Sequence, residues 1–365
     1  MTRVAVWHTG RVGSAAARMV ALSPSMELVG CYTRSPEKIG VDVGALCNVG
    51  PIGVTATDRA NLLLESRPDC VFYAPARPDL DDMIRIVSSG TNLVTPALVL
   101  NGRRQLGDEH GHLDAAATRA GVSVYGGGMH PGLIHAIALT ASGGCQWVEQ
   151  LRVVSSKDCT YSAIPDEWKR QGIGASPDDP ALASAAEEST RFRAEAVDVI
   201  GTALGIEFDD VRCDFEVAVA TSRMDLGFMV IERGTVAGIK TLWRGIVDDA
   251  VVVENETCYR LGDAMKPDWP TLNGYMVEIH GHPSIKVAFE HEFAAGFSAG
   301  FDPGTITAAP LVNAIPAVCR AQPGIVLLHE MPTVTAHGAA GPRATWAQPR
   351  DWQITKPRGA WPSKS

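Results

Sequence analysis

This sequence lacks paired cysteines, basic patches and long apolar runs. Its eight cysteines show no C-x-x-C pair and no repeated spacing; they are Cys31, Cys47, Cys70, Cys145, Cys159, Cys213, Cys258 and Cys319. This scatter argues against a disulfide framework or a structural zinc site, and favours reduced thiols in a cytoplasmic protein. A net charge of −9 without a clustered basic stripe argues against nucleic acid or an anionic membrane surface as the main partner.

Membrane and secretory segments are also missing. No apolar run reaches the roughly 18–20 residues that span a bilayer. The first predicted strand begins almost at Met1, so we expect no signal peptide. A chain of 365 residues is long enough to form two domains. A small-molecule substrate is therefore the expected partner.

The most informative stretch runs from Val4 to Gly13 and reads Val-Ala-Val-Trp-His-Thr-Gly-Arg-Val-Gly. A short apolar strand that leads through a glycine turn into a helix is typical of a dinucleotide-binding domain. The pattern is incomplete, because His8 stands where G-x-G-x-x-G has its first glycine, and a turn without a ligand is the alternative interpretation. The predicted cofactor contacts in this stretch are His8, Gly10, Arg11, Val12 and Gly13.

Strands and helices then alternate through the first part of the chain. Further strands are predicted at residues 27–33, 53–58, 70–75, 92–95 and 122–125, with helical segments between them. Strict alternation predicts a doubly wound parallel sheet, that is, an α/β Rossmann domain.

The end of the second predicted strand indicates which cofactor is used. NAD-specific domains place an acidic residue there for the ribose 2′-hydroxyl. This chain instead has Thr33, Arg34 and Ser35, with Lys38 close behind, which suits a 2′-phosphate. We therefore expect NADP(H) to be preferred and NAD(H) to be possible, the alternative being a solvated basic turn. Three more cofactor contacts are expected at later strand ends: Ala74, Pro75 and Thr95.

The pattern changes near residue 150, where adjacent strands with little helix predict a second, α+β domain with a mainly antiparallel sheet. The predicted divisions are a dinucleotide-binding domain at 1–148, a substrate and dimerisation domain at 149–303, a returning helix and strand at 304–338, and an irregular tail at 339–365. One face of such a sheet needs cover, from a second copy of the chain or from the first domain.

Residues 185–204 predict one amphipathic helix, with Arg191 and Arg193 on its polar side. Residues 158–179 contain Tyr161, Trp168 and several glycines, and are predicted to form a long loop or lid.

Several segments together resemble a known family. Residues 34–57, the turn Met129-His130-Pro131-Gly132 and the helix at 311–318 are similar to dihydrodipicolinate-reductase-like proteins, in particular the branch of 2,4-diaminopentanoate dehydrogenases and NAD(P)H-dependent amine dehydrogenases. The resemblance covers roughly residues 3–335. It implies a Rossmann domain, a C-terminal domain whose sheet supports a homodimer, and reversible hydride transfer between NAD(P)H and a C=N bond.

The sequence departs from this family at one decisive place. Amine-forming members carry an acidic pair after the fifth strand, whereas this chain reads Thr95-Pro96-Ala97-Leu98-Val99, so both acidic positions are apolar. A neutral pocket neither holds ammonia nor stabilises an iminium cation. Amine formation is therefore in doubt, and the alternatives are a ketone or preformed-imine reductase that uses another acid, or a cofactor-binding sensor or subunit without activity. The predicted pocket for a small, largely apolar substrate is formed by Leu98, Val99, Met129, Trp168 and Asn313.

Two residues are candidates for the missing proton donor. His130 follows three glycines at the expected edge of the sheet, and an unperturbed imidazole titrates near pH 6.5. Tyr161 is the second candidate, in a stretch that resembles a pocket-lining segment of the family. No metal site is predicted, since the His-Gly-His pairs at 110–112 and 280–282 have no accompanying ligand set.

Overall fold

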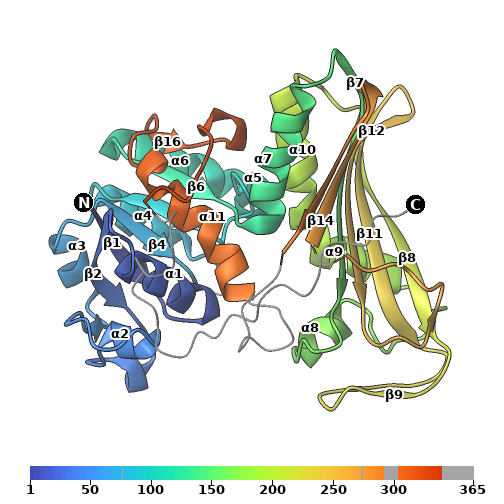
Figure 1. The fold of residues 1–365 in the computed structure, drawn as a ribbon, viewed down its shortest axis with the longest axis horizontal. Coiled ribbons are helices and arrows are strands. Elements are labelled where there is room, and N and C mark those ends of the chain that lie inside the picture. Colours follow the sequence, from blue (N-terminus) through green and yellow to red (C-terminus); the bar gives the residue numbers. More distant parts are fainter. Residues whose placement is uncertain (76, 273, 292–302, 339–365) are drawn as a thin grey trace, which may run out of the picture.

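The computed structural model describes residues 1–75, 77–272, 274–291 and 303–338, which form two lobes side by side (Figure 1). The N-terminal lobe contains a seven-stranded parallel sheet and the C-terminal lobe a seven-stranded mixed sheet. This architecture confirms the predicted fold class. Within the described residues, no helix combines the length and apolar character that a bilayer crossing requires. The predicted tail at 339–365 lies outside the described residues.

The N-terminal sheet has the strand order β16-β6-β5-β4-β1-β2-β3, and all its pairings are parallel. Its strands are β1 (Thr2–Trp7), β2 (Met26–Tyr32), β3 (Ala56–Thr57), β4 (Cys70–Tyr73), β5 (Asn92–Thr95), β6 (Ser123–Gly126) and β16 (Gly324–Ile325). The helices of this lobe are α1 (Arg11–Ala21), α2 (Val43–Leu46), α3 (Ala60–Glu65), α4 (Leu80–Ser88), α5 (Arg103–Leu106), α6 (His110–Ala120) and α11 (Pro303–Val318). The strand order reverses between β1 and β4, and such a reversal opens a crevice at the carboxyl ends of the strands.

Both faces of this sheet are covered, as the apolar run of β4 predicts. All four residues of β4 are buried. Val6 and Phe72 pack with Ile315 of α11 on one side, while Val71 and Leu93 pack with Ile86 of α4 on the other. The chain thus returns late in the sequence to complete the core of its first lobe.

The C-terminal sheet has the order β13-β8-β11-β12-β7-β14-β15, and β12 with β7 is its parallel pair. Its strands are β7 (Trp147–Asp158), β8 (Asp210–Ala220), β11 (Val236–Val247), β12 (Ala250–Arg260), β13 (Met265–Lys266), β14 (Gly274–His282) and β15 (Ile285–Glu290), and β9 (Met224–Asp225) pairs with β10 (Val230–Ile231) in a separate hairpin. The helices of this lobe are α7 (Ile134–Ser142), α8 (Pro165–Arg170), α9 (Leu182–Thr190) and α10 (Ala194–Leu204).

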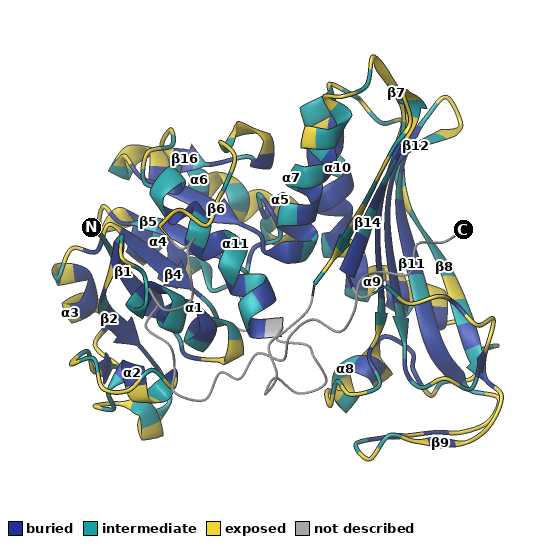
Figure 2. Ribbon diagram, in the orientation of Figure 1, coloured by how far each residue is buried: buried dark blue, intermediate teal, exposed yellow. Residues whose placement is uncertain are grey.

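Helices cover the face of the C-terminal sheet that is turned toward the N-terminal lobe, which we call the inner face (Figure 2). Val153 of β7 and Val277 of β14 are buried there in one cluster with Ile134 of α7 and Ile200 of α10. The alternation of side chains along each strand puts every second residue on this face. The expected cover is corrected for this face in one respect, because it comes from α9 and α10 of the second domain as well as from α7, which lies within the predicted first domain.

The single helix predicted over residues 185–204 is also a wrong prediction, because it breaks into α9 and α10 at the turn Arg191–Arg193. At this break Arg193 points inward, where its guanidinium donates to Thr257 Oγ1 at 2.9 Å and to the Tyr259 hydroxyl at 2.7 Å. Helical periodicity places Arg193 on the polar side of the helix, whereas the structure buries it on the inner face.

Candidate functional site

The glycine turn after β1 has the features of a phosphate-binding loop. Gly10 is the N-cap of α1, and no side chain caps the first backbone N–H groups of that helix. A Cβ atom on Gly10 would meet no atom within 4 Å, and the buried Thr9 Oγ1 has no hydrogen-bond partner. Open space, free N–H donors and an orphaned hydroxyl together fit a dinucleotide pyrophosphate. Arg11 and Val12 form the first turn of α1, beside this space.

Gly13 and His8 are held together by backbone geometry. A Cβ atom on Gly13 would lie 2.0 Å from the His8 carbonyl oxygen, so no larger residue fits without a shift. His8 has a φ angle of 75°, in the left-handed region that favours glycine. This conformation explains why dinucleotide-binding patterns place a glycine there.

The basic residues after β2 gather next to the glycine turn. Lys38 Nζ donates to the Thr9 carbonyl at 2.8 Å. The Arg34 side chain is 57% exposed and contacts the carboxylates of Asp82 at 2.7 Å and Asp79 at 3.4 Å. Thr33 is buried and its hydroxyl accepts the backbone N–H of Ser35 at 3.1 Å. Carboxylates are therefore present beside Arg34, although they come from the start of α4 and not from β2.

The remaining predicted cofactor contacts meet at the carboxyl edge of the sheet. Ala74 N donates to the Trp7 carbonyl at 2.9 Å, and Pro75 follows it. The Thr95 hydroxyl donates to the Tyr73 carbonyl at 2.7 Å. Gly127 N donates to the Thr95 carbonyl at 3.1 Å, which ties the ends of β5 and β6 together. His130 follows three residues later.

Six polar side chains from distant segments meet on the inner face of the C-terminal sheet. We call them the inner-face cluster: His130, Lys157, Arg193, Asn255, Tyr259 and Tyr275. Lys157 and Tyr259 are in-register partners of the parallel pair β7 and β12, so their side chains share this face. His130 comes from the turn after β6. The cluster therefore stands where the carboxyl edge of the N-terminal sheet meets the second lobe.

Asn255 fixes the protonation pattern of two histidines. Its amide nitrogen faces the Arg193 carbonyl at 3.4 Å, so its Oδ1 is the acceptor for His130 Nε2 at 3.0 Å and His135 Nε2 at 3.3 Å. Gly132 N donates to His135 Nδ1 at 3.2 Å. Burial and nearby cations lower the pKa of His130 well below 6.5, and burial lowers the pKa of His135 to about 4. Both rings are thus neutral at pH 7 with the proton on Nε2, and His130 presents an acceptor nitrogen elsewhere.

Lys157 and Tyr275 form the second pair of the cluster. Lys157 Nζ donates to the Tyr275 hydroxyl at 2.8 Å, and the His130 ring stacks on Tyr275 with centroids 5.5 Å apart. Burial, with the nearby charge of Arg193, lowers the pKa of Lys157 to about 8, whereas burial raises the pKa of Tyr275. Lys157 and the next residue, Asp158, could form an ordinary surface pair on sequence alone. Asp158 instead accepts a hydrogen bond from Thr160 N at 2.9 Å, and Lys157 turns inward.

Two predicted site residues lie outside this cluster, and a third borders it. Leu98 is 0% exposed and packs in the core with Leu93 and Val124, so the prediction that it lines a substrate pocket is corrected. Trp168 is buried in a different apolar cluster, where its indole N–H donates to the Ser162 carbonyl at 2.7 Å. Its ring packs edge-on against Tyr259 with centroids 5.5 Å apart, so Trp168 borders the inner-face cluster. Tyr161 is 79% exposed on the surface of the turn before α8, too open to shield a reacting proton.

The other predicted pocket residues are closer to the carboxyl edge. Met129 is buried beside His130 in the cluster that contains Tyr275. Val99 is partly buried against the core that α1 and α11 share. Asn313 is half-buried on α11, a helix that also contacts β5 and the turn at 129–133.

Glu195 is a buried carboxylate near the cluster, and it serves another purpose. Its oxygens accept the backbone N–H groups of Arg103 at 3.2 Å and Arg104 at 2.7 Å, at the start of α5. Burial raises the pKa of Glu195 to about 7. This carboxylate caps a helix of the first lobe, and it does not replace the acidic pair missing from residues 98 and 99.

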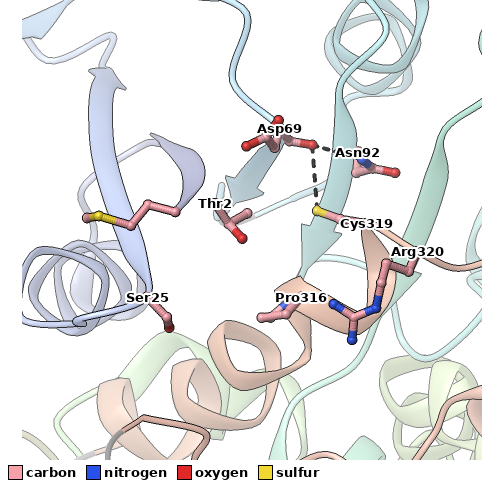
Figure 3. A pocket seen from close by; sticks show the side chains of 8 residues that line it. Thr2, Ser25, Asp69, Asn92, Pro316, Cys319 and Arg320 are labelled. Carbon is pink, nitrogen blue, oxygen red and sulfur yellow. Dashed lines mark hydrogen bonds between the residues drawn. The ribbon is translucent and has the colours of Figure 1, made fainter.

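A hollow of about 400 Å³ lies at the opposite edge of the N-terminal sheet (Figure 3). It is lined by Thr2, Asp69 and Asn92 at the amino ends of β1, β4 and β5. Sheets of this kind bind ligands at their carboxyl ends, so this hollow is not part of the site. In the described part of the chain, no three histidine, cysteine or carboxylate side chains gather as metal ligands.

Known proteins match the chain over nearly its whole length. Residues 133–343 match the 2,4-diaminopentanoate dehydrogenase C-terminal domain, and residues 2–73 match the N-terminus of dihydrodipicolinate reductase. An amine dehydrogenase of Streptomyces virginiae is 30% identical over 93% of this chain and 99% of its own length. A 2,4-diaminopentanoate dehydrogenase of Acetoanaerobium sticklandii is 25% identical over 92% of this chain and 94% of its own length. The structure of an amine dehydrogenase from Mycobacterium smegmatis shares the fold, with a TM-score of 0.70 and 22% identity over 92% of this chain and 98% of that one.

Proposed function

Because the chain belongs to the family of 2,4-diaminopentanoate dehydrogenases and amine dehydrogenases, which are NAD(P)-dependent oxidoreductases, we propose that it reduces a C=O or preformed C=N group of a small substrate. Membership confirms the resemblance inferred from residues 34–57, 129–132 and 311–318. The residues that would hold the cofactor are those of the glycine turn, with Arg34, Lys38 and the strand ends at Ala74 and Thr95. When bound, the nicotinamide supplies the hydride in reduction and accepts it in oxidation.

The pair of Lys157 and Tyr275 carries this proposal. Reduction of C=O or C=N needs a proton as well as a hydride, and a buried lysine with a pKa of about 8 is protonated at neutral pH yet releases its proton readily. Because Lys157 Nζ donates to the Tyr275 hydroxyl at 2.8 Å, the hydroxyl proton passes to the substrate while Lys157 replaces it. Tyr275 thereby acts as a relay and never becomes a free phenolate.

His130 has a different task in this proposal from the one that the sequence suggested. The Nε2–H of His130 donates to Asn255, so the neutral ring has no other proton to give to the substrate. Its stacking on Tyr275 holds the relay in place. Tyr161, the other candidate from the sequence, is too exposed to take part.

The charges of the cluster argue against capture of ammonia. Arg193 and Lys157 are cations, and the acidic positions of amine-forming relatives are Leu98 and Val99 in this chain. An ammonium ion next to two buried cations is disfavoured electrostatically. We therefore favour carbonyl or preformed-imine reduction over reductive amination.

Following NADPH oxidation at 340 nm tests this function, over a panel of ketones, aldehydes and stable cyclic imines, each with and without ammonium chloride. We expect turnover with a carbonyl or cyclic imine and no acceleration by ammonium at matched ionic strength. Absence of turnover across the panel in both directions contradicts the proposed activity. A rate that requires ammonium contradicts the choice of reaction.

NADP(H) is the cofactor that we propose as preferred. Exposed Arg34 and nearby Lys38 supply two cations beside the glycine turn, and β2 itself ends without a carboxylate. Asp79 and Asp82 orient the Arg34 guanidinium and partly compensate its charge. We therefore expect NAD(H) to bind as well, but more weakly than NADP(H).

We also propose a homodimer that forms through the outer face of the C-terminal sheet, opposite to the inner face. Arg152 contacts Glu254 at 2.7 Å and Glu278 at 2.8 Å there, and both carboxylates are mostly shielded. In Figure 2 the helices of the described residues lie on the opposite side of this sheet. Sedimentation velocity at micromolar concentration should give a mass near twice that of one chain. The variant Arg152→Glu should shift it to the monomer, and a monomeric wild-type chain contradicts the proposal.

A cytoplasmic location completes the proposal. All eight cysteines are free thiols, and several of them, such as Cys31 and Cys70, are buried in the core. Such thiols are typical of proteins in a reducing compartment.

A further inference from the structure

Two cysteines meet at the edge of the N-terminal sheet that lies away from the cofactor turn. Cys70 is the first residue of β4, and Cys319 directly follows the last residue of α11. Both pack in the apolar cluster between this sheet and α11, and a side-chain hydrogen bond joins their thiols. The Cys319 thiol also contacts the carbonyl oxygen of Asp69, the neighbour of Cys70, at 3.8 Å. The fold therefore places two thiols from distant parts of the chain side by side.

The two thiols differ in their access to solvent. Cys70 is 0% exposed, whereas Cys319 is half-buried and lines the hollow of about 400 Å³ at this edge (Figure 3). This volume is ample for a molecule as small as a peroxide. An oxidant can therefore reach the sulfur of Cys319 first, with the sulfur of Cys70 behind it.

The surroundings of Cys319 favour its deprotonated, reactive form. The hydrogen bond from Cys70, helped by the charge of Arg320, lowers the pKa of Cys319, whereas burial raises the pKa of Cys70. Cys31 and Cys159 also have a thiol neighbour, but burial raises the pKa of each to about 12. A thiolate that solvent can reach, next to a second thiol, is the arrangement typical of oxidation-sensitive cysteines.

We propose that Cys319 and Cys70 form a peroxide-sensitive site that closes to a reversible disulfide. The Cys319 thiolate attacks one oxygen of hydrogen peroxide, so that an S–O bond forms, the O–O bond breaks and hydroxide leaves. Cys70 then attacks the Cys319 sulfur; the S–S bond forms, the S–O bond breaks, and hydroxide leaves with the Cys70 proton as water. The thiols are oxidised and the peroxide is reduced to water. A dithiol reductant reverses the change, as expected of a transient disulfide in a reducing compartment.

Peptide mapping of the full-length protein tests this site. The reduced protein is exposed to a small molar excess of hydrogen peroxide, its remaining thiols are blocked with N-ethylmaleimide, and it is digested without reductant for mass spectrometry. We expect linked peptides that contain Cys70 and Cys319. Free thiols should fall from eight to six per chain, because one disulfide consumes two, and dithiothreitol should restore all eight.

Three variants assign the roles of the two thiols. Cys319→Ser should form no link at Cys70. Cys70→Ala should stop at a sulfenic acid on Cys319, which dimedone captures, because the second thiol is missing. Cys145→Ser removes another half-buried cysteine and serves as the matched control, so it should form the link as the wild-type protein does.

The outcomes that overturn the proposal are specific. A wild-type protein that keeps all eight thiols under peroxide overturns it, even if a variant fails to fold. A bond from Cys319 to a cysteine other than Cys70, or between two chains, overturns it as well. Oxidation of Cys319 to a sulfinic acid while Cys70 stays a free thiol has the same effect. None of these measurements requires turnover, so the result is independent of the proposed reductase activity.

Discussion

The cofactor side and the substrate side of this protein are built in different ways. Gly10, Gly13 and His8 lie within six residues of one another, and their roles depend on backbone geometry: a helix N-terminus, a close approach and a left-handed φ angle. The inner-face cluster depends on side chains from residues 130, 157, 193, 255, 259 and 275, which only the tertiary fold brings together. A local site tolerates changes elsewhere in the chain, whereas a dispersed site changes chemistry when one side chain is replaced.

The largest effect is expected from Lys157→Met, which removes the proton source on the substrate side. General acid catalysis contributes about 10²- to 10⁴-fold, so kcat for reduction should fall by that factor. The Kd for NADPH, measured by fluorescence titration, should stay within about 2-fold, because the two sides are separate. The exposed Lys169→Met serves as the matched control.

The pH profile of the wild-type enzyme sharpens the same test. The reduction requires protonated Lys157, whose pKa is about 8, so kcat should be level below this pH and fall above it. The oxidation, which needs the neutral amine, should rise over the same range. A Lys157→Met enzyme that keeps both its rate and this profile refutes the assigned role.

The next-largest effects are expected from two glycine substitutions on the cofactor side. In Gly13→Ala the new Cβ would lie 2.0 Å from the His8 carbonyl, so the free energy of unfolding should fall by about 1–3 kcal/mol and NADPH binding should weaken. In Gly10→Ala the Cβ meets no protein atom within 4 Å, so stability should change by less than about 1 kcal/mol while NADPH binding weakens at least about 10-fold. Chemical denaturation and NADPH titration distinguish the two. Equal loss of stability in both variants contradicts this account of the turn.

A smaller effect is expected from Arg34→Ala, which tests cofactor choice. Loss of a charge-assisted contact to the 2′-phosphate should raise the Kd for NADPH about 10- to 100-fold and leave that for NADH within about 2-fold. The exposed Arg59→Ala is the control. Equal weakening of both cofactors removes the 2′-phosphate assignment.

The smallest effect is expected from His130→Gln. A glutamine amide can replace the Nε2–H donor toward Asn255, so folding should be retained, and loss of the stacking on Tyr275 should lower kcat less than about 10-fold. The comparison with Lys157→Met under identical conditions decides between the two donors. If His130→Gln is the more damaging change, the proton comes from His130 as the sequence first suggested.

The sequence predicted the first lobe well and the substrate side poorly, for identifiable reasons. The apolar strand Cys70–Tyr73 and the turn at Gly10 and Gly13 carry local patterns that need no knowledge of distant residues. Leu98 was expected in a pocket because family relatives have an acidic residue there, yet an apolar side chain at that place packs into the core. Arg193 was assigned to a helix surface because periodicity assumes an unbroken helix. Lys157 belongs to the stretch around Tyr161 that resembles a pocket-lining segment of the family, but nothing in that stretch indicates that its side chain meets Tyr275.

The sequence by itself determined the α/β fold, the glycine turn and the absence of the family's acidic pair, because each is written in consecutive or regularly spaced residues. Tertiary structure alone decided that Lys157 meets Tyr275, that Asn255 uses the proton of His130, and that Arg193 is buried without a carboxylate partner among the described residues. The physical reason is that hydrogen bonds and desolvation depend on distances between side chains, and residues far apart in the chain acquire those distances only when the sheet and its covering helices assemble.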